Sequence, residues 1–352
     1  MRNTAYPSNV DKRRSWLLVL LYAGLVVGAS DQLPSALKKS CTIFTAVQGD
    51  TVLYGNSEDQ HNPDPVIGFY PPSPGNYGSV HFGITRPDGQ YNFEGAVNDQ
   101  GLAWDCNSTP KARLDPDPNP SKPYFLADYN FLDRITTKAA NVEEAIRIAK
   151  LYQYGDVLKG QYHIADASGD AVVISGGPDG KIAFTRKEPG DGYLLSTNFN
   201  LAQPDKGPVD FRWETAKGRL DALGNGVVLS PEYALSLMEA VHLETLTTYT
   251  LYQNVLDLNE NKVYLSYMSQ FNEVAVIDMT EEFQKGQHVV AMREFFSPET
   301  AAAGDAAYQR FALRFKSAIA GVLTLGAGML LLIVRLIVKI IMRKGTGANA
   351  VP

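Results

Sequence analysis

The chain has 352 residues, of which 45% are hydrophobic and 20% charged, and its formal net charge is −6 at pH 7. This composition is typical of a folded globular protein and excludes an intrinsically disordered chain. Because Lys and Arg form no block outside the two ends, the sequence predicts no nucleic-acid partner. Only two cysteines occur, Cys41 and Cys106, without the paired spacing of a zinc site, so we expect neither a metal nor a cofactor.

The N-terminus has the organisation of a secretory signal peptide. Basic residues at positions 12–14 precede the apolar run Trp16–Val27, and small residues follow that run. A run of this length is short for a membrane span but typical of the apolar core of a signal peptide. We therefore predict export, with a signal peptide over residues 1–30 and a short propeptide over residues 31–40. An uncleaved N-terminal anchor is the alternative, and both the general secretory and the twin-arginine route stay open.

A second apolar segment lies near the C-terminus. Ser317–Val334 contains no charged residue and, at about 1.5 Å per residue, is just long enough to cross the hydrocarbon core of a membrane. Basic residues follow it and favour the cytoplasmic side for the tail. We predict a linker over residues 296–316, a membrane helix with its basic flank over 317–342, and a tail over 343–352. The middle of the chain would then lie on the extracytoplasmic face of a single-pass membrane protein; a helix that lies on the membrane or pairs with a partner is the alternative.

Between these ends, strand-like segments alternate with blocks of helical periodicity. The expected strands are Cys41–Val47, Thr51–Tyr54, Ser79–Thr85, Tyr91–Val97, Gln161–Ala165, Ala171–Ser175, Tyr193–Thr197, Thr248–Leu256, Lys262–Tyr267 and Glu273–Asp278. The expected helices are Tyr124–Lys138, Val142–Tyr152, Val209–Leu223 and Pro231–Val241. Asn141 and Ser230 stand where helix N-caps are expected, and Leu114–Pro123 is a proline-rich loop. The pattern predicts an α+β domain over residues 41–295, with antiparallel sheets covered by helices.

One cysteine has an unusual position. The five histidines are scattered, and no local pattern pairs one of them with a cysteine. Cys41, by contrast, opens the first predicted strand shortly after the predicted signal peptide. If the Ser40–Cys41 bond were cut, Cys41 would carry both a thiol and a free α-amine. The ordinary pKa values of these groups are roughly 8.5 and 8, so the amine can act as the base for the thiol without a histidine.

The surrounding residues resemble a known family. Cys41–Phe44 followed by Gly55–Asp59 is similar to the start of the choloylglycine hydrolase and penicillin V acylase family, and more closely to its linear-amide C–N hydrolase branch. Further similar segments follow in the family's order: Asn98–Leu102, Asp105–Asn107, Ser196–Asn198, Phe211–Trp213 and Tyr252–Leu265. The resemblance runs from residue 41 to about residue 285. It implies an N-terminal-nucleophile (Ntn) hydrolase with an αββα four-layer sandwich fold.

The resemblance also implies roles for five residues. Cys41 would be the nucleophile and, through its amine, the base, and Asp59 would hold the amine or the thiol. Asn198, with Asn107 or its backbone N–H, would form the oxyanion hole, in which each donor is typically worth about 3 kcal/mol. Arg212 would lie beside Cys41, lower the pKa of the thiol and help with the charge of the substrate or intermediate. The implied reaction is attack on an amide carbonyl, formation of a thioester, release of the amine and hydrolysis.

The chain departs from the family at several positions. Bile-salt and penicillin V enzymes usually carry Arg where this chain has Asn56 and Asn where it has Ser57, so their substrates do not carry over. We expect a small N-acyl amide substrate, and the membrane anchor favours a lipidic one. Cys106 replaces a small residue common before Asn107. A Cys41–Cys106 disulfide, which would silence the enzyme or act as a redox switch, is therefore an alternative to two free thiols.

Two other functions stay open at the level of sequence. One is a catalytically silent, membrane-tethered binding protein on the same fold, in which Cys41 remains internal or disulfide-bonded. The other is an acyltransferase, in which an amine rather than water resolves the thioester. The number of subunits is also open, homo-oligomers included. Asn107-Ser108-Thr109 matches an N-glycosylation sequon, but its expected place in the active-site wall argues against modification.

Overall fold

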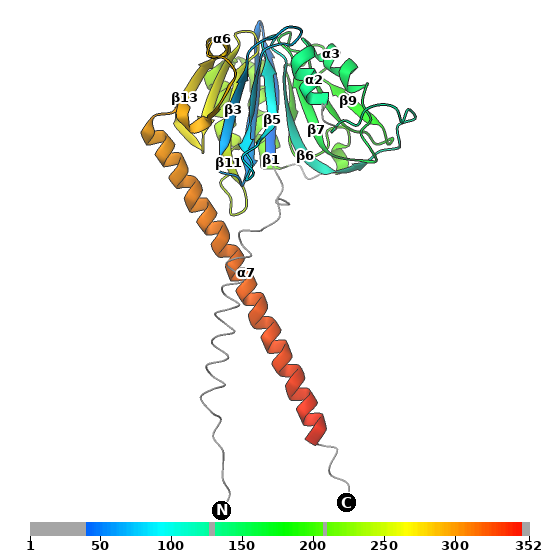
Figure 1. Cartoon of the computed structure of the whole chain (residues 1–352), viewed down its shortest axis with the longest axis vertical. Helices are drawn as coiled ribbons and strands as arrows, with labels where there is room; N and C mark the ends of the chain where they lie inside the picture. Colours follow the sequence, from blue (N-terminus) through cyan, green and yellow to red (C-terminus); the bar gives the residue numbers. More distant parts are fainter. Residues whose placement is uncertain (1–39, 127–130, 207–209, 347–352) are drawn as a thin grey trace, which may run out of the picture. The chain divides into compact units, whose positions relative to one another are not determined.

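Figure 1 shows the computed structural model of the chain, which describes residues 40–126, 131–206 and 210–346. The predicted signal peptide and the predicted propeptide up to residue 39 lie outside the described residues, as does the end of the predicted tail, residues 347–352. The chain divides into two compact units; we call Lys38–Tyr308 the first unit, and the second contains Gln309–Pro352 together with the N-terminal end of the chain. The first unit contains all the strands of the described residues.

The first unit is built on two antiparallel sheets. The six-stranded sheet has the order β10-β1-β2-β11-β12-β13, with β10 (Tyr193–Ser196), β1 (Ser40–Gln48), β2 (Thr51–Gln60), β11 (Tyr249–Asp257), β12 (Lys262–Tyr267) and β13 (Gln270–Asp278). The eight-stranded sheet has the order β14-β3-β4-β5-β6-β7-β8-β9, with β14 (His288–Ala291), β3 (Pro65–Tyr70), β4 (Ser79–Thr85), β5 (Tyr91–Asn98), β6 (Ala103–Arg113), β7 (Val157–Ala165), β8 (Ala171–Gly176) and β9 (Ile182–Arg186). Strand β1 is a central strand, and both its neighbours, β10 and β2, run antiparallel to it.

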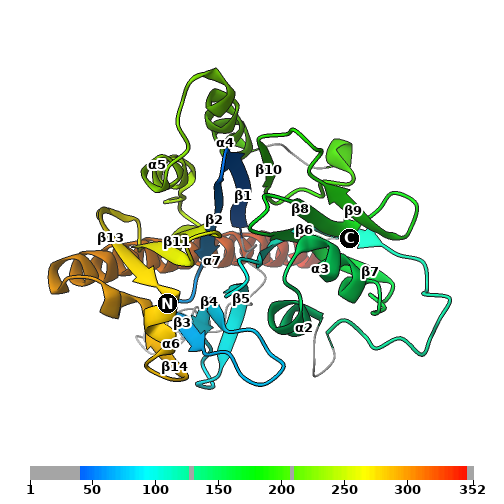
Figure 2. The ribbon, with the colours of Figure 1, turned by 90° about the horizontal axis from the view of Figure 1, so that it is seen from above.

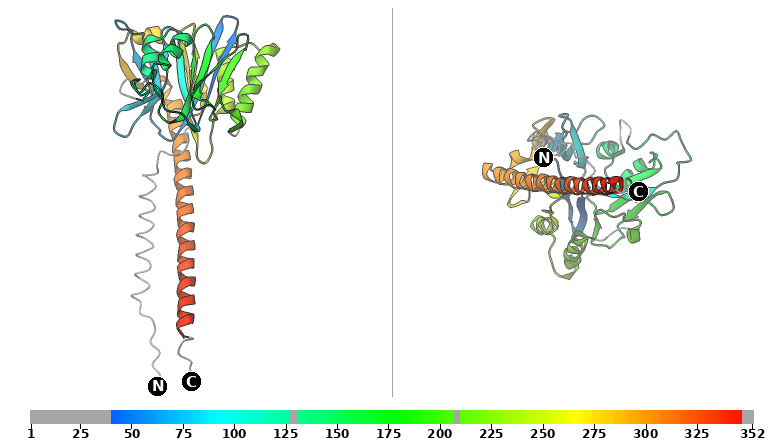
Figure 3. Two further views of the ribbon diagram at one scale, coloured as in Figure 1. Left: turned by 90° about the vertical axis from the view of Figure 1, so that its right-hand side faces the viewer. Right: turned by 90° about the horizontal axis from the view of Figure 1, so that it is seen from below.

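Helices cover the outer faces of the two sheets, as Figures 2 and 3 show. The α-helices of the first unit are α2 (Phe131–Lys138), α3 (Val142–Ala149), α4 (Phe211–Ala222), α5 (Pro231–Val241) and α6 (Met279–Phe283), with short 3₁₀ turns at Pro204–Lys206, Leu223–Asn225 and Met292–Phe295. The pair α4 and α5 packs on β1, β2, β10 and β11, whereas α2 and α3 pack on β5 and β7. Each pair closes its own apolar core. The predicted α+β sandwich is therefore confirmed.

The inner faces of the two sheets meet through buried polar contacts. His163 of β7 bonds through Nε2 to the Thr45 hydroxyl of β1 at 2.9 Å and through Nδ1 to the Ser196 hydroxyl of β10 at 2.9 Å. Its backbone carbonyl accepts the hydroxyl of Tyr54 at 3.0 Å. Burial lowers the pKa of His163 to about 3, so the ring is neutral. This neutral histidine therefore ties the two sheets together.

Local sequence signals explain several helix ends. The side chain of Asn141 accepts the backbone N–H of Glu144 at 3.0 Å and begins α3, as predicted. Ser230 caps α5 in the same way, and Pro231 occupies its first turn. Asp210 caps α4 by accepting the backbone N–H groups of Arg212 and Trp213.

The structure differs from the predicted elements where polar residues lie in strands. Strand β2 continues to Gln60 instead of ending at Tyr54, because it pairs with β1 on one side and β11 on the other. Strand β6 carries the polar motif Asp105–Asn107, and neither β6 nor β3, β9 and β14 was predicted. The helix expected at Tyr124–Lys138 begins at Phe131 within the described residues. Tertiary pairing overrides the weak strand propensity of the polar segments in β2 and β6.

The C-terminal helix α7 is continuous from Pro298 to Thr346 (Figure 3). Its first residues, expected to form a linker, are helical and belong to the first unit up to Tyr308. There Asp305 accepts the hydroxyl of Tyr267 at 2.6 Å and pairs with Arg293 at 2.8 Å. The helix, counted over Pro298–Leu336, has an apolar window of mean hydropathy 2.3 with no residue buried. By length and composition it can cross a membrane.

Candidate active site

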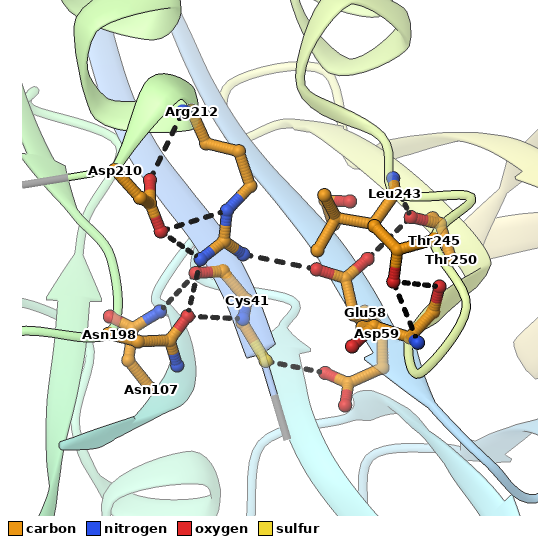
Figure 4. Close-up of polar contacts among 12 residues, drawn as sticks. Cys41, Glu58, Asp59, Asn107, Asn198, Asp210, Arg212, Leu243, Thr245 and Thr250 are labelled. Atoms are coloured by element: carbon orange, nitrogen blue, oxygen red, sulfur yellow. Dashed lines mark hydrogen bonds and ion pairs between the residues drawn. The ribbon is translucent and has the colours of Figure 1, made fainter. Parts of the chain in front are cut away.

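Cys41 lies at the start of β1, opposite Glu58 of β2, and only 2% of it is exposed. Its backbone nitrogen, thiol and carbonyl are each held by a different side chain (Figure 4). The N–H donates to Asn198 Oδ1 at 3.1 Å, and the thiol donates to Glu58 Oε2 at 3.3 Å. The carbonyl accepts the side-chain amide of Asn107 at 3.0 Å. All three polar groups of the predicted nucleophile are therefore fixed in direction.

Arg212 connects this cysteine to the helical layer. It lies in the first turn of α4, is 3% exposed and extends towards β2. Its guanidinium donates to Asp59 Oδ2 at 3.1 Å and to Asn198 Oδ1 at 2.9 Å. It also pairs with Asp210, the N-cap of the same helix. Asn198 Oδ1 consequently accepts from both Arg212 and the nitrogen of Cys41, so two hydrogen bonds through one oxygen link the positive charge to that nitrogen.

Asp59 lies on the face of β2 opposite to that of Glu58, because successive strand residues alternate. Its carboxyl accepts Arg212 on one oxygen and the hydroxyl of Thr250 on the other. The Thr250 oxygen in turn accepts the backbone N–H of Leu243 at 2.7 Å. Burial raises the pKa of Asp59 above its ordinary range, although Arg212 and Thr250 act in the opposite direction.

The thiol of Cys41 is held in its neutral form in the uncut chain. Burial raises its pKa well above the ordinary value, and the nearby acids Glu58, Asp105 and Asp59 raise it further. The expectation that Arg212 lowers the pKa of this thiol concerns the cut chain and stays a prediction. In the uncut chain Arg212 is engaged by Asp59 and Asp210, while acids surround the sulfur.

The two predicted oxyanion residues use their N–H groups on backbone carbonyls. Asn198 Nδ2 donates to the carbonyl of Ser108 at 2.9 Å, and Asn107 Nδ2 donates to that of Cys41. Gln161 holds the Asn107 side chain by donating to its Oδ1 at 3.3 Å. Each side-chain amide nitrogen carries two N–H groups, so either asparagine can keep its backbone partner and direct its second N–H at a substrate oxygen.

The five predicted site residues form one connected cluster, but their contacts differ in part from those expected. Asp59 contacts Arg212 and Thr250, and it is Glu58 that accepts the thiol of Cys41. Sequence reasoning missed Glu58, although it directly precedes Asp59 in the family-like motif. It also missed Asp105 and Asp210, which neighbour predicted residues in the same way. The signal that identifies Glu58 is strand alternation, and it requires that β2 extends to Gln60.

The two cysteines are free thiols in this structure. Trp104 and Cys106 of β6 pack towards the core under α2 and α3, whereas Cys41 lies on β1 of the other sheet. The Cys41–Cys106 disulfide considered from the sequence is therefore not formed. Among the described residues, no group of three or more His, Cys, Asp or Glu side chains is placed to hold a metal ion.

Comparison with solved structures identifies the fold. Two variants of the conjugated bile acid hydrolase from Clostridium perfringens match with TM-scores of 0.52 and 0.54 at 16% identity, over 71% of this chain and 96% of theirs. Penicillin V acylase from Agrobacterium tumefaciens matches with a TM-score of 0.51 at 17% identity, over 68% of this chain and 87% of its own. The chain has the fold of these two hydrolases. The suspected resemblance is thus confirmed at the level of fold, while no family profile and no curated protein sequence matches the chain.

We predict that Arg212→Leu lowers the free energy of unfolding of the detergent-solubilised chain by about 3 kcal/mol, because it leaves a buried acid without its partner. Lys217→Ala on the same helix is the matched control, since its pair with Asp221 is exposed and typically worth under about 1 kcal/mol. Adding Asp59→Asn to Arg212→Leu should recover part of the loss. Equal losses for Arg212→Leu and Lys217→Ala in chemical denaturation would contradict the ion-pair account.

We also predict that Cys41 of the uncut chain reacts with iodoacetamide at pH 8 at least about tenfold more slowly than free cysteine, because the thiolate is the reactive form and the pKa is raised. The rate should increase with pH up to values well above those at which free cysteine levels off. The measurement uses Cys106→Ser, so that one thiol remains, and intact mass separates uncut from cut molecules. Alkylation as fast in the folded chain as in the urea-denatured chain would show that the thiol is neither buried nor neutral.

Proposed function

We propose that the chain is a hydrolase of linear amide C–N bonds that uses Cys41, exposed as an N-terminal residue, as its nucleophile. The observation that carries the proposal is the separate fixation of the nitrogen, sulfur and carbonyl of Cys41 by Asn198, Glu58 and Asn107. The backbone N–H and carbonyl of a buried strand residue ordinarily bond to backbone groups of a neighbouring strand, whereas those of Cys41 bond to side chains. The shared fold with bile acid hydrolase and penicillin V acylase supports the same conclusion.

The proposed reaction follows from these contacts. After cleavage of the Ser40–Cys41 bond, the nitrogen held by Asn198 becomes an amine that accepts the proton of the thiol. The sulfur attacks the amide carbonyl of the substrate, and the amine returns the proton to the leaving nitrogen. Asn107 or Asn198 donates a side-chain N–H to the developing oxyanion. Water then hydrolyses the thioester and regenerates the thiol.

Arg212 and Asp59 position the nucleophile in this proposal. Arg212 donates to the oxygen of Asn198 at 2.9 Å and so holds that oxygen towards the Cys41 nitrogen; the amide cannot rotate without losing the bond to Arg212. Asp59 and Asp210 fix Arg212 in turn. Position 56 is Asn, where bile-salt and penicillin V enzymes usually carry Arg, so we expect a substrate other than bile salts or penicillin V. We propose a small N-acyl amide, lipidic in character and reached from a membrane into which α7 anchors the exported domain.

The expected test result is an acyl-enzyme on Cys41. A panel of N-acyl amides, varied in acyl chain and amine, is incubated with the membrane-purified full chain and quenched in acid. Intact mass should show an added acyl group that hydroxylamine removes, and Cys41→Ala should abolish both the adduct and the turnover. Cys106→Ser is the matched control and should retain both. Turnover that survives Cys41→Ala would overturn the proposal.

A further inference from the structure

Glu58 has a contact that the proposed catalytic cycle does not use. The thiol of Cys41 donates to its Oε2 at 3.3 Å, and Gln60 Nε2 donates to its Oε1 at 2.7 Å. Glu58 is 1% exposed. A carboxyl group whose two oxygens both accept hydrogen bonds has the arrangement of a carboxylate, which can take up a proton. Gln60 also donates to Glu94, so the carboxylate is part of a buried polar chain.

We propose that Glu58 is the base of a self-cleavage reaction that frees Cys41, an inference that rests on the proposed N-terminal-cysteine function and extends it. The proton of the thiol passes to Glu58 Oε2 as the sulfur attacks the carbonyl carbon of Ser40. The bond between that carbon and the nitrogen of Cys41 breaks, and Glu58 gives the proton to the departing nitrogen. A thioester between Ser40 and the sulfur results. Water hydrolyses it to a carboxylate at Ser40 and a free thiol, so no external reagent is required.

The geometry around Cys41 supports an attack on its own preceding carbonyl. The attack forms a five-membered ring within adjacent residues, so the reacting atoms are held together by the chain itself. Asn198 holds the nitrogen at 3.1 Å, and Asn107 holds the carbonyl of Cys41 at 3.0 Å. Cys41 is thus fixed on both sides of its Cα. After the bond to Ser40 breaks, the nitrogen of Cys41 is an amine that can still donate to Asn198.

Electrostatics favour a base that acts during the attack. Because burial and the acids raise the pKa of the thiol, a preformed thiolate is disfavoured, and the proton must leave as the new bond forms. The same acids favour the products, since the released amine can take up a proton and become a cation beside Glu58, Asp59 and Asp105. The acids therefore oppose the thiolate but stabilise the cut chain.

The neighbouring acids differ from Glu58 in what they contact. Asp59 lies on the other face of β2 and is engaged by Arg212 and Thr250. Asp105 Oδ1 accepts the backbone N–H of Cys106 at 2.6 Å, and Asp105 affects the thiol of Cys41 through its charge. Substituting an acid that acts only through its charge and substituting an acid that acts as the base should change the cleavage rate in opposite directions. Removing a charge lowers the pKa of the thiol and speeds cleavage, whereas removing the base slows it.

The test compares Glu58→Gln with Asp105→Asn in the full chain. Chains are synthesised in a pulse into membranes, and intact mass gives the fraction that begins at Cys41 over time. We expect Glu58→Gln to slow cleavage at least about 100-fold, as general-base catalysis is typically worth this much, and Asp105→Asn not to slow it. Glu58→Asp, which keeps a carboxylate on a shorter side chain, should cleave more slowly than wild type but faster than Glu58→Gln.

The outcomes separate this inference from the proposed function. Amidase activity is expressed per molecule that begins at Cys41, so slow cleavage and lost chemistry are distinguished. Cleavage of Glu58→Gln at or above the wild-type rate overturns the role of Glu58 and leaves the amidase proposal intact. A wild-type chain that is never cut before Cys41 overturns both. Near-ultraviolet circular dichroism and the cleavage of Glu58→Asp show whether Glu58→Gln is slow because of its chemistry or its folding.

Discussion

The antiparallel pairing of β1 with β2 is the constraint on which the rest of the site depends. It sets Cys41 opposite Glu58 and Ser40 opposite Asp59. Because strand residues alternate between faces, the pairing directs Glu58 towards the sulfur between the sheets and Asp59 towards the helices. Two adjacent acids of one strand therefore act in different layers of the molecule. A shift of one residue in this register would exchange their places.

On the helical side, one buried cation organises several acceptors. Arg212 joins the N-cap of α4, the carboxyl of Asp59 and the amide of Asn198. Buried ion pairs add little net stability compared with apolar packing, but breaking one is costly and the bonds are directional. The guanidinium thus serves mainly to fix Asn198, and through it the nitrogen of Cys41. This explains why a cation so close to the nucleophile does not produce a reactive thiolate in the uncut chain.

The sequence predicts which residues gather at the site better than it predicts which of them contact one another. Cys41, Asn198 and Arg212 are far apart in the chain, and only their order and likeness to family motifs bring them together. The N-caps at Asn141 and Ser230 follow from local rules and agree with the structure. The contact of Glu58 with the thiol could not be predicted, because the polar end of β2 has weak strand propensity and is held by its two neighbours.

The measurement that tests the central claim most directly is the N-terminal residue of the mature protein. Membrane-purified chain would be analysed by intact mass and by N-terminal sequencing, with Cys41→Ala prepared in parallel. The account predicts that the wild-type chain begins at Cys41 and that the substituted chain retains residues before position 41. A wild-type chain that begins near Ser30, or still at Met1, would contradict it and leave a membrane-tethered binding protein as the better account.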